Sequence, residues 1–227
     1  MREYSVFDIL GPIMIGPSSS HTAGAARLGK IASTIAGGKI RKVQFFLHGS
    51  FAKTYKGHGT DKALVAGILG MNPWDQNLKN SIQLAKEKNI EIEFIETDLG
   101  DVHPNTVKFV ITREDGKVSE IMGSSIGGGN VVITEVDGDK IEFTGVYPTI
   151  LINHVDVPGM VAKVSSVLYK YKINIAFMRV YRENIKGAKA AMVFEVDDFV
   201  SDDVVDEISK ISNVHRVRAI NPISEEE

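Results

Sequence analysis

The amino-acid sequence predicts an α+β protein with two domains, on three observations. The 227 residues are enough for two modest hydrophobic cores. The first part of the chain places helical patterns before a run of strands and hairpins, which favours segregated helices and strands over a doubly wound sheet. The last part has the order βαββαβ, the ferredoxin-like arrangement. We therefore predict a mixed α/β domain at 1–146 and a ferredoxin-like domain at 148–222.

Three helices and one strand are predicted before residue 90. A turn-rich segment, GPSSSHTAG at 16–24, leads into a helix whose apolar residues share one face and which ends near Gly37. A short buried strand follows at 42–47. A second turn-rich segment, TYKGHGTD at 54–61, precedes a helix over 61–70 that Thr60 caps. Asn72-Pro73 opens a third helix, to about Lys88.

From residue 90 the apolar residues recur with a period of two, which indicates strands. Strands are predicted at 90–98, 106–115, 117–125 and 131–145, the last of these being a hairpin itself. Asp115-Gly116 and Asp137-Gly138 are strong hairpin turns.

The C-terminal domain begins with a strand at 149–155, and Pro158-Gly159 then opens an amphipathic helix. Two strands flank a short loop, RENIKG at 182–187. Ser201 caps a second helix, over 202–211, and 214–220 forms a final strand. The last residues, SEEE, are an acidic tail.

Composition excludes several classes of protein. Hydrophobic residues make up 43% of the chain and charged residues 24%, with a net charge of −3, so nothing favours a nucleic acid or an acidic membrane as partner. The first residues lack the pattern of a signal peptide, and no apolar run approaches a membrane span, so we expect a cytoplasmic protein. The chain has no cysteine, which excludes disulfides, thiolate nucleophiles and an iron–sulfur cluster held by its own thiolates.

Two polar motifs in the first half suggest a reactive site. GPSSSHT places hydroxyl groups before a helix, where free N–H groups favour a carboxylate, and its histidine could move a proton or bind substrate. A plain polar N-cap is an equally good explanation. KGHGTD combines Lys56, His58 and Asp61 with glycines that allow a ligand to approach the backbone, and His58 is a candidate general base. On its own, a glycine-rich surface loop explains it better.

Three further motifs carry weaker signals. His103 and Asn105 lie in VHPN just before a strand, and SSIGGG at 124–129 could present N–H donors to an anion. HVDVPGM at 154–160 joins the first strand and helix of the C-terminal domain. There Asp156, or Asn174 after the helix, could hold an ammonium or carboxylate group, although ordinary helix-start chemistry explains both.

Taken together, these segments resemble one enzyme family. GPSSSHTAGAARLG, HGSFAKTYKGHGTDKAL, VHPN and SSIGGG resemble, in order, the signature stretches of the beta domain of iron–sulfur L-serine dehydratases, over residues 1–145. Residues 148–222 resemble an ACT domain, a small-ligand sensing module. In that family a [4Fe-4S] cluster is held by cysteines of an alpha domain, fused or on a separate chain. The absence of cysteine implies the two-chain form, with an alpha subunit as partner and no metal ligands in this chain.

The resemblance implies conversion of L-serine to pyruvate and ammonia, with a cluster iron acting as a Lewis acid on the substrate hydroxyl. It implies His58 as the general base, His103 as a second candidate, and His21 as a contact to substrate or near the cluster. The implied contacts to the substrate carboxylate are Ser18, Ser19, Ser20 and Thr22. The implied further contacts are Asn105, Ser124 and Ser125.

The C-terminal domain resembles the serine-sensing ACT domains of D-3-phosphoglycerate dehydrogenases. His154, Pro158-Gly159 and Asn174 match their ligand motif, while Asp156 stands where the family has an asparagine. An aspartate removes an amide donor and adds a charge, which favours an ammonium group over a carboxylate. An amino-acid effector held by His154, Asp156 and Asn174, a metal ion, or a purely dimer-forming role are all open, and we expect copies to pair through this domain.

Two alternatives to a serine dehydratase subunit were weighed. A non-catalytic, amino-acid-sensing module of the phosphoglycerate dehydrogenase type has no need for KGHGTD and VHPN together, so their joint presence favours catalysis. A pyridoxal-phosphate dehydratase needs a Schiff-base lysine in a large cofactor-binding fold, and the sequence offers neither context.

Overall fold

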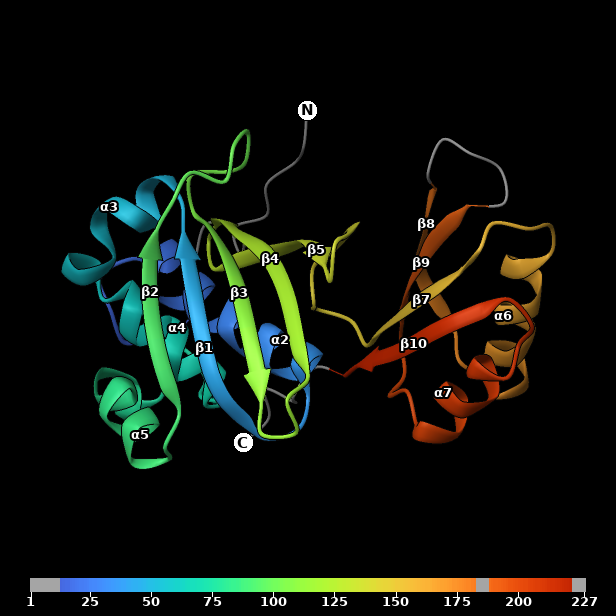
Figure 1. The fold of residues 1–227 in the computed structure, drawn as a ribbon, viewed down its shortest axis with the longest axis horizontal. Coiled ribbons are helices and arrows are strands. Elements are labelled where there is room, and N and C mark those ends of the chain that lie inside the picture. The colour runs from blue at the N-terminus through green and yellow to red at the C-terminus, as the bar shows by residue number, and fades with distance from the viewer. Residues whose placement is uncertain (1–12, 183–187, 222–227) are drawn as a thin grey trace. The chain divides into compact units, whose positions relative to one another are not determined.

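The computed structural model describes residues 13–182 and 188–221, which form two compact units divided between Gly138 and Asp139 (Figure 1). The predicted α+β class is confirmed. The helices are α2 (Ala25–Ala36), α3 (Gly49–His58), α4 (Thr60–Ile68), α5 (Ser81–Glu87), α6 (Met160–Lys170) and α7 (Asp202–Ser209). The strands are β1 (Ile40–Leu47), β2 (Glu91–Glu96), β3 (Thr106–Arg113), β4 (Val118–Gly127), β5 (Asn130–Val136), β6 (Asp139–Phe143), β7 (Thr149–Val155), β8 (Ile175–Arg182), β9 (Lys189–Val196) and β10 (Val214–Ile220).

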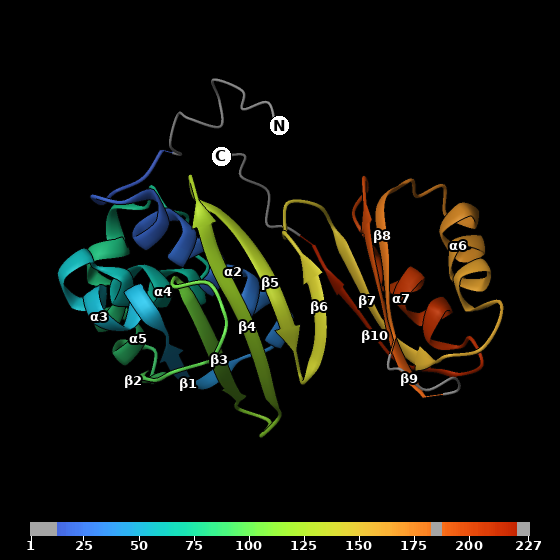
Figure 2. The same cartoon turned by 90° about the horizontal axis from the view of Figure 1, so that it is seen from above.

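The first sheet has six strands in the order β2-β1-β3-β4-β5-β6. β1 and β2 are parallel, whereas β1–β3, β3–β4 and β4–β5 are antiparallel. Helices α2, α3, α4 and α5 gather on one face of this sheet (Figure 2). Burial alternates along β1: Val43, Phe45 and Leu47 are fully buried, and the residues between them are partly exposed, because successive side chains of a strand point to opposite faces. This face forms the core of the N-terminal unit.

Two glycines allow helices α2 and α4 to touch through their backbones. A side chain at Gly29 would overlap the Leu64 carbonyl oxygen, and one at Gly67 would overlap the Ala26 carbonyl oxygen. Both positions have ordinary helical geometry, so the need for glycine comes from close approach alone. Helix α2 begins just after GPSSSHT and helix α4 begins within KGHGTD, so this contact fixes the spacing between the two motifs.

Several local predictions were wrong. The segment at 54–61 is no loop: residues 54–58 continue α3, Gly59 ends that helix with a left-handed φ of 71°, and α4 begins at once. Thr60 therefore lies inside α4, and its buried hydroxyl has no hydrogen-bond partner among the described residues. The third helix is interrupted as well, with a 3₁₀ turn at Gln76–Asn80 before α5.

The predicted hairpins are confirmed. Asp137 and Gly138 both have positive φ angles, 52° and 87°, as the tightest two-residue turns require. The hairpin at Asp115-Gly116 joins β3 to β4. By its pairing β6 belongs to the first sheet, although it is grouped with the second compact unit, where Asp139 accepts a hydrogen bond from Asn153 at 2.6 Å. The predicted domain boundary at 146–148 therefore stays a prediction.

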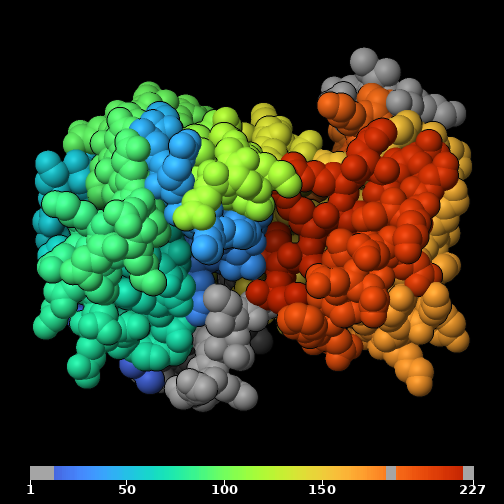
Figure 3. All heavy atoms as spheres, turned by 60° about the horizontal axis from the view of Figure 1, so that its bottom comes forward, coloured from blue at the N-terminus to red at the C-terminus, as the bar shows by residue number. Residues whose placement is uncertain are grey.

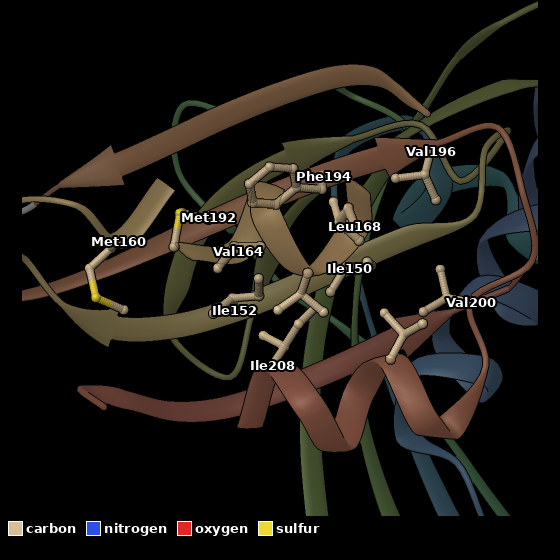
Figure 4. Packing of buried hydrophobic residues seen from close by; sticks show 12 residues of the cluster. Ile150, Ile152, Met160, Val164, Leu168, Met192, Phe194, Val196, Val200 and Ile208 are labelled. Carbon is tan, nitrogen blue, oxygen red and sulfur yellow. The ribbon is translucent and has the colours of Figure 1, made fainter. Parts of the chain in front are cut away.

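The second unit has the predicted βαββαβ order, with sheet order β10-β7-β9-β8. Helices α6 and α7 cover one face of this sheet (Figure 2). The core between them is built from alternate strand residues such as Ile150, Ile152, Met192 and Phe194, which meet Leu168 from α6 (Figure 4). Ser201 stands at the N-cap of α7 as predicted, but its side chain makes no capping hydrogen bond.

Some predictions lie outside the described residues: the N-terminal segment up to residue 12, most of the loop at 182–187, and the acidic tail. Within residues 13–182 and 188–221, no helix combines the length and the apolar character that crossing a bilayer requires.

Candidate active site

His21 is held by hydroxyl groups on both sides of its ring. Residues Ser19–Gly24 form a π-helical turn before α2, and Ser18 precedes it in extended conformation, with its hydroxyl accepting from the His21 backbone N–H at 3.3 Å. The same hydroxyl lies 3.4 Å from His21 Nδ1. On the other side, His21 Nε2 lies 3.3 Å from Ser50 Oγ and 3.2 Å from Thr54 Oγ1, both on α3.

His58 stands beside His21 at the last residue of α3. The two ring centroids are 4.9 Å apart, with the planes tilted by 55°. Phe51, two helical turns before His58, packs edge-on against His21 at a centroid distance of 5.3 Å and is fully buried. His58 is exposed whereas His21 is half-buried, so the outer ring of the pair is the one open to a substrate.

The two histidines differ in electrostatic environment. Burial of the ring, and secondarily the charge that His58 can carry, lower the pKa of His21 below its ordinary value. His21 is therefore neutral at neutral pH. Nearby, burial raises the pKa of the Asp61 carboxyl, although its bond from the Lys62 N–H, at 2.8 Å, partly opposes this.

The VHPN turn is attached to the start of α3. The Pro104 carbonyl accepts hydrogen bonds from the Ser50 N–H at 2.8 Å and the Phe51 N–H at 3.4 Å. A side chain at Gly49 would come within 2.7 Å of the Pro104 carbonyl oxygen, and Gly49 also has a φ of 56°, so glycine is required there twice over. His103 accepts from the Asn105 N–H at 3.1 Å through Nδ1, and its ring is exposed.

The serines of SSIGGG lie in strand β4 and are buried, in agreement with the strand predicted at 117–125, and β4 extends two residues further, to Gly127. Ser124 Oγ is 2.7 Å from Thr106 Oγ1. Ser125 exchanges backbone contacts with Asn105: the Ser125 N–H donates to the Asn105 carbonyl at 3.0 Å, and Asn105 Nδ2 lies 3.5 Å from the Ser125 carbonyl. The Ser125 hydroxyl has no partner among the described residues and lies against Gly24, where an added side chain would overlap it.

These contacts close into a ring. His21 contacts Ser50, the backbone of residue 50 binds Pro104, Asn105 binds Ser125, and Ser125 packs on the turn that carries His21. Four segments separated by up to about a hundred residues therefore meet at one place. The turn also brings in Thr22, whose buried hydroxyl is unpartnered among the described residues and lies against Gly16.

Not every predicted residue reaches the histidine pair. Ser19 and Ser20 are half-buried within the π-helical turn, and neither side chain makes a hydrogen bond to another described residue. His103 lies apart from the two histidines: its Nδ1 accepts from the Asn105 N–H, and its carbonyl accepts from the Thr106 hydroxyl. Sequence reasoning missed Ser50, Phe51 and Thr54. Residues 50 and 54 are four apart and share one face of a helix, a spacing that could have indicated this pair. The interpretation of 54–61 as a loop concealed it.

The residues that the structure describes offer no set of ligands for an iron–sulfur cluster. The chain contains no cysteine. Within the described ranges no three histidine, cysteine or acidic side chains lie close enough together to hold a metal ion. The residues of this chain therefore do not fit a cluster.

A surface hollow of about 590 Å³ lies over α5 and β2, between residues such as Lys79, Gln83, Ile90 and Ile92. These elements are the green region in Figure 3. None of the predicted site residues lines it, so volume alone does not mark the active site.

The three residues predicted to bind an effector are separated in one chain. His154 is buried and its Nδ1 lies 2.7 Å from the Val155 carbonyl oxygen, while Asp156 accepts from Arg182 Nε at 2.8 Å. Val155 pairs with Lys189 at one end of β9, whereas Asn174 bonds Asp197 beyond the other end. Eight strand residues span roughly 24 Å. Within one chain Asn174 is thus remote from the other two, and the effector site stays a prediction.

Comparison with known proteins agrees with this architecture. The family described as "Serine dehydratase beta chain" matches residues 5–87, and the ACT domain family matches residues 148–213. The class defined by fold and site is thus a serine dehydratase-type beta domain followed by an ACT domain.

Individual relatives narrow this further. A protein of Bacillus subtilis named "Probable L-serine dehydratase, beta chain" is 47% identical over 97% of this chain and 99% of its own length. The "L-serine dehydratase, beta chain" of Peptoniphilus asaccharolyticus is 44% identical over 87% of this chain and 89% of its own. A D-3-phosphoglycerate dehydrogenase of Methanocaldococcus jannaschii is 31% identical over 87% of this chain but only 37% of its own. This chain belongs to the family of L-serine dehydratase beta chains.

Proposed function

We propose that this chain is the beta subunit of a two-chain L-serine dehydratase, which converts L-serine to pyruvate and ammonia. The observation that carries the proposal is the convergence of GPSSSHT, KGHGTD, VHPN and the Ser124-Ser125 strand around His21 and His58. A module that only senses an amino acid has no need for an exposed histidine, His58, packed beside a neutral histidine, His21. Two relatives that match nearly end to end carry the same printed activity in their names.

In this proposal His58 removes the α-proton of serine. Its ring is exposed at the end of α3, so it can meet a substrate, and histidine is the side chain that most often acts as a general base. The α-proton of an amino acid is very weakly acidic, so the carboxylate must also be bound and oriented. In this proposal the start of the turn that precedes α2 binds the carboxylate, because backbone N–H groups at a helix start attract an anion.

The iron–sulfur cluster belongs, in this proposal, to cysteines of a separate alpha subunit. The family resemblance is its support, together with the lack of cysteine and of a metal-binding cluster in the part of this chain that the structure describes. No step of the reaction is assigned to the cluster through residues of this chain. Its residues bind, orient and deprotonate the substrate at the interface with the partner.

We also propose that two copies pair through the ACT domain. β8 is an edge strand of the second sheet, and Phe177, Met178 and Val180 on it are 55%, 44% and 39% exposed. An edge strand with exposed apolar residues is a ready site for pairing with another strand. Such a pair would be the setting in which Asn174 of one copy and Asp156 of the other could hold an amino-acid effector.

The test is anaerobic co-expression with the cysteine-containing alpha chain, reconstitution with iron and sulfide, and measurement of pyruvate from L-serine. We expect pyruvate only when both chains are present, with loss on exposure to air. The purified beta chain should be colourless and inactive, so an iron–sulfur absorption band from it alone would contradict the proposal. A complex with a full cluster and no pyruvate would favour the amino-acid-sensing alternative.

A further inference from the structure

We infer that Thr54 is a positioning residue that fixes the tautomer of His21, with the ring proton on Nε2. A consequence, which rests on the proposed function, is that His21 cannot be the general base and the role falls to His58. The inference uses the three hydroxyl groups around the His21 ring and the number of protons they can donate.

Thr54 has one hydroxyl proton, and that proton is already used. Its Oγ1 donates to the Ser50 carbonyl oxygen one helical turn earlier, at 2.7 Å, which is the usual backbone bond of a helical threonine. The same Oγ1 lies 3.2 Å from His21 Nε2. While it makes this backbone bond, Thr54 can only accept from the histidine, which places the proton on Nε2.

The opposite side of the ring agrees with this assignment. The Ser18 oxygen accepts from the His21 backbone N–H, which leaves its own proton free to donate to Nδ1, 3.4 Å away. The neutral ring then donates at Nε2 and accepts at Nδ1, so both nitrogens are engaged.

The other tautomer leaves an unfavourable contact. With the proton on Nδ1, that nitrogen could donate to Ser18, and Ser50 could donate to Nε2 across 3.3 Å. The Thr54 oxygen, however, would face the lone pair of Nε2 at 3.2 Å with no proton between them, or Thr54 would have to give up its shorter bond to the Ser50 carbonyl in order to donate to Nε2. Thr54 is thus the hydroxyl that favours one tautomer over the other, because Ser18 and Ser50 can form a hydrogen bond with either tautomer.

This assignment determines what His21 can do. A base must offer a free lone pair to the substrate, and the lone pair of His21 Nδ1 is taken by Ser18. Burial of the ring further opposes its protonation. His21 is instead a neutral ring, centred 4.9 Å from the centre of the His58 ring, that packs beside the base and orients it.

The test is long-range ¹H–¹⁵N spectroscopy of the histidine side chains in the full chain, with His21 assigned from the signals lost in His21→Gln. We expect the Nε2–H pattern in the wild type and in Thr54→Ser, which keeps the hydroxyl. In Thr54→Val we expect a measurable Nδ1–H population. The matched control is Thr34→Val, which removes the same type of backbone bond in α2, to Lys30, and should change nothing at His21.

A wild-type His21 in the Nδ1–H form would overturn the inference, and so would an unchanged tautomer in a folded Thr54→Val. In the reconstituted enzyme, Thr54→Val should lower kcat roughly tenfold, on the order of one hydrogen bond, with little change in KM and with recovery in Thr54→Ser. If the enzyme is inactive but the spectra follow this pattern, the proposed function fails and the tautomer assignment stands. If the enzyme is active and Thr54→Val leaves both spectra and kcat unchanged, only the present inference fails.

Discussion

The two units treat their predicted polar residues in opposite ways. In the N-terminal unit, motifs far apart in sequence converge on His21 and His58 through short loops and helix starts. In the C-terminal unit, His154 and Asp156 lie at one end of the sheet and Asn174 beyond the other. The first arrangement brings its polar residues together within one chain. The second needs a residue from another copy, or does not bind an effector with these three residues.

The largest expected difference between the units is in turnover. His58→Ala should lower kcat by about 10²–10⁴-fold, the usual contribution of a general base, with little loss of folding stability because the ring is exposed. Asn174→Ala, also at an exposed position, should leave turnover without effector unchanged. Pyruvate formation and thermal unfolding of both variants check this, and near-normal turnover of His58→Ala would remove His58 as the base.

A second contrast concerns packing at the site. Gly24→Ala should destabilise the chain by about 1–3 kcal/mol, because the new methyl group would overlap the buried Ser125 hydroxyl while the backbone φ of −62° suits alanine. Adding Ser125→Gly should recover part of this loss, as a double-mutant cycle in urea would measure.

Gly57→Ala is the matched control for that substitution. Gly57 is also helical, but nothing lies within 4 Å of where its side chain would stand. This variant should be neutral or more stable by about 0.5–1 kcal/mol. Equal losses for Gly24→Ala and Gly57→Ala would contradict the close contact between the turn and β4.

A third prediction concerns pH. Because the folded state lowers the pKa of His21, the unfolded chain binds more protons in the interval below the ordinary histidine pKa of about 6.5. The stability linked to His21 is thus fully present above that pH and is lost as the pH falls through the folded pKa. The free energy of unfolding, measured in urea between pH 5 and 8, should depend less steeply on pH in His21→Gln than in the wild type. The same pH dependence in both proteins would argue against a buried neutral ring.

The smallest expected effect is in the C-terminal unit. Asp156→Asn removes the pair with Arg182, whose side chain is 57% exposed, and should change stability by under about 1 kcal/mol. The same variant restores the asparagine of the related serine-sensing domains. Calorimetry with L-serine would show tighter binding to the variant if the charge disfavours the carboxylate of the effector, and equal or absent binding in both proteins would leave domain pairing as the role of this unit.

The sequence predicted the strands better than the site. Period-two patterns and the Asp-Gly turns gave β3, β4, β7 and β10 nearly to the residue, because alternation and positive φ angles are local properties. The KGHGTD segment misled because its glycines indicated a loop, whereas tertiary packing of Phe51 keeps α3 helical up to His58. Ser50 and Thr54 could be found only once that helix was known, and the separation of Asn174 from Asp156 only once the strand register was known.

The contact between Gly29 and Gly67 has a consequence for how this chain tolerates mutation. Neither residue touches the histidines, yet each admits no side chain because a carbonyl oxygen of the other helix occupies the space. In a saturation library selected for serine breakdown, both positions should be as intolerant as His58, whereas the exposed Lys62 on α4 should accept many residues. Intolerance at 29 and 67 would then report the fixed separation of two helices, and a catalytic role inferred from it would be mistaken.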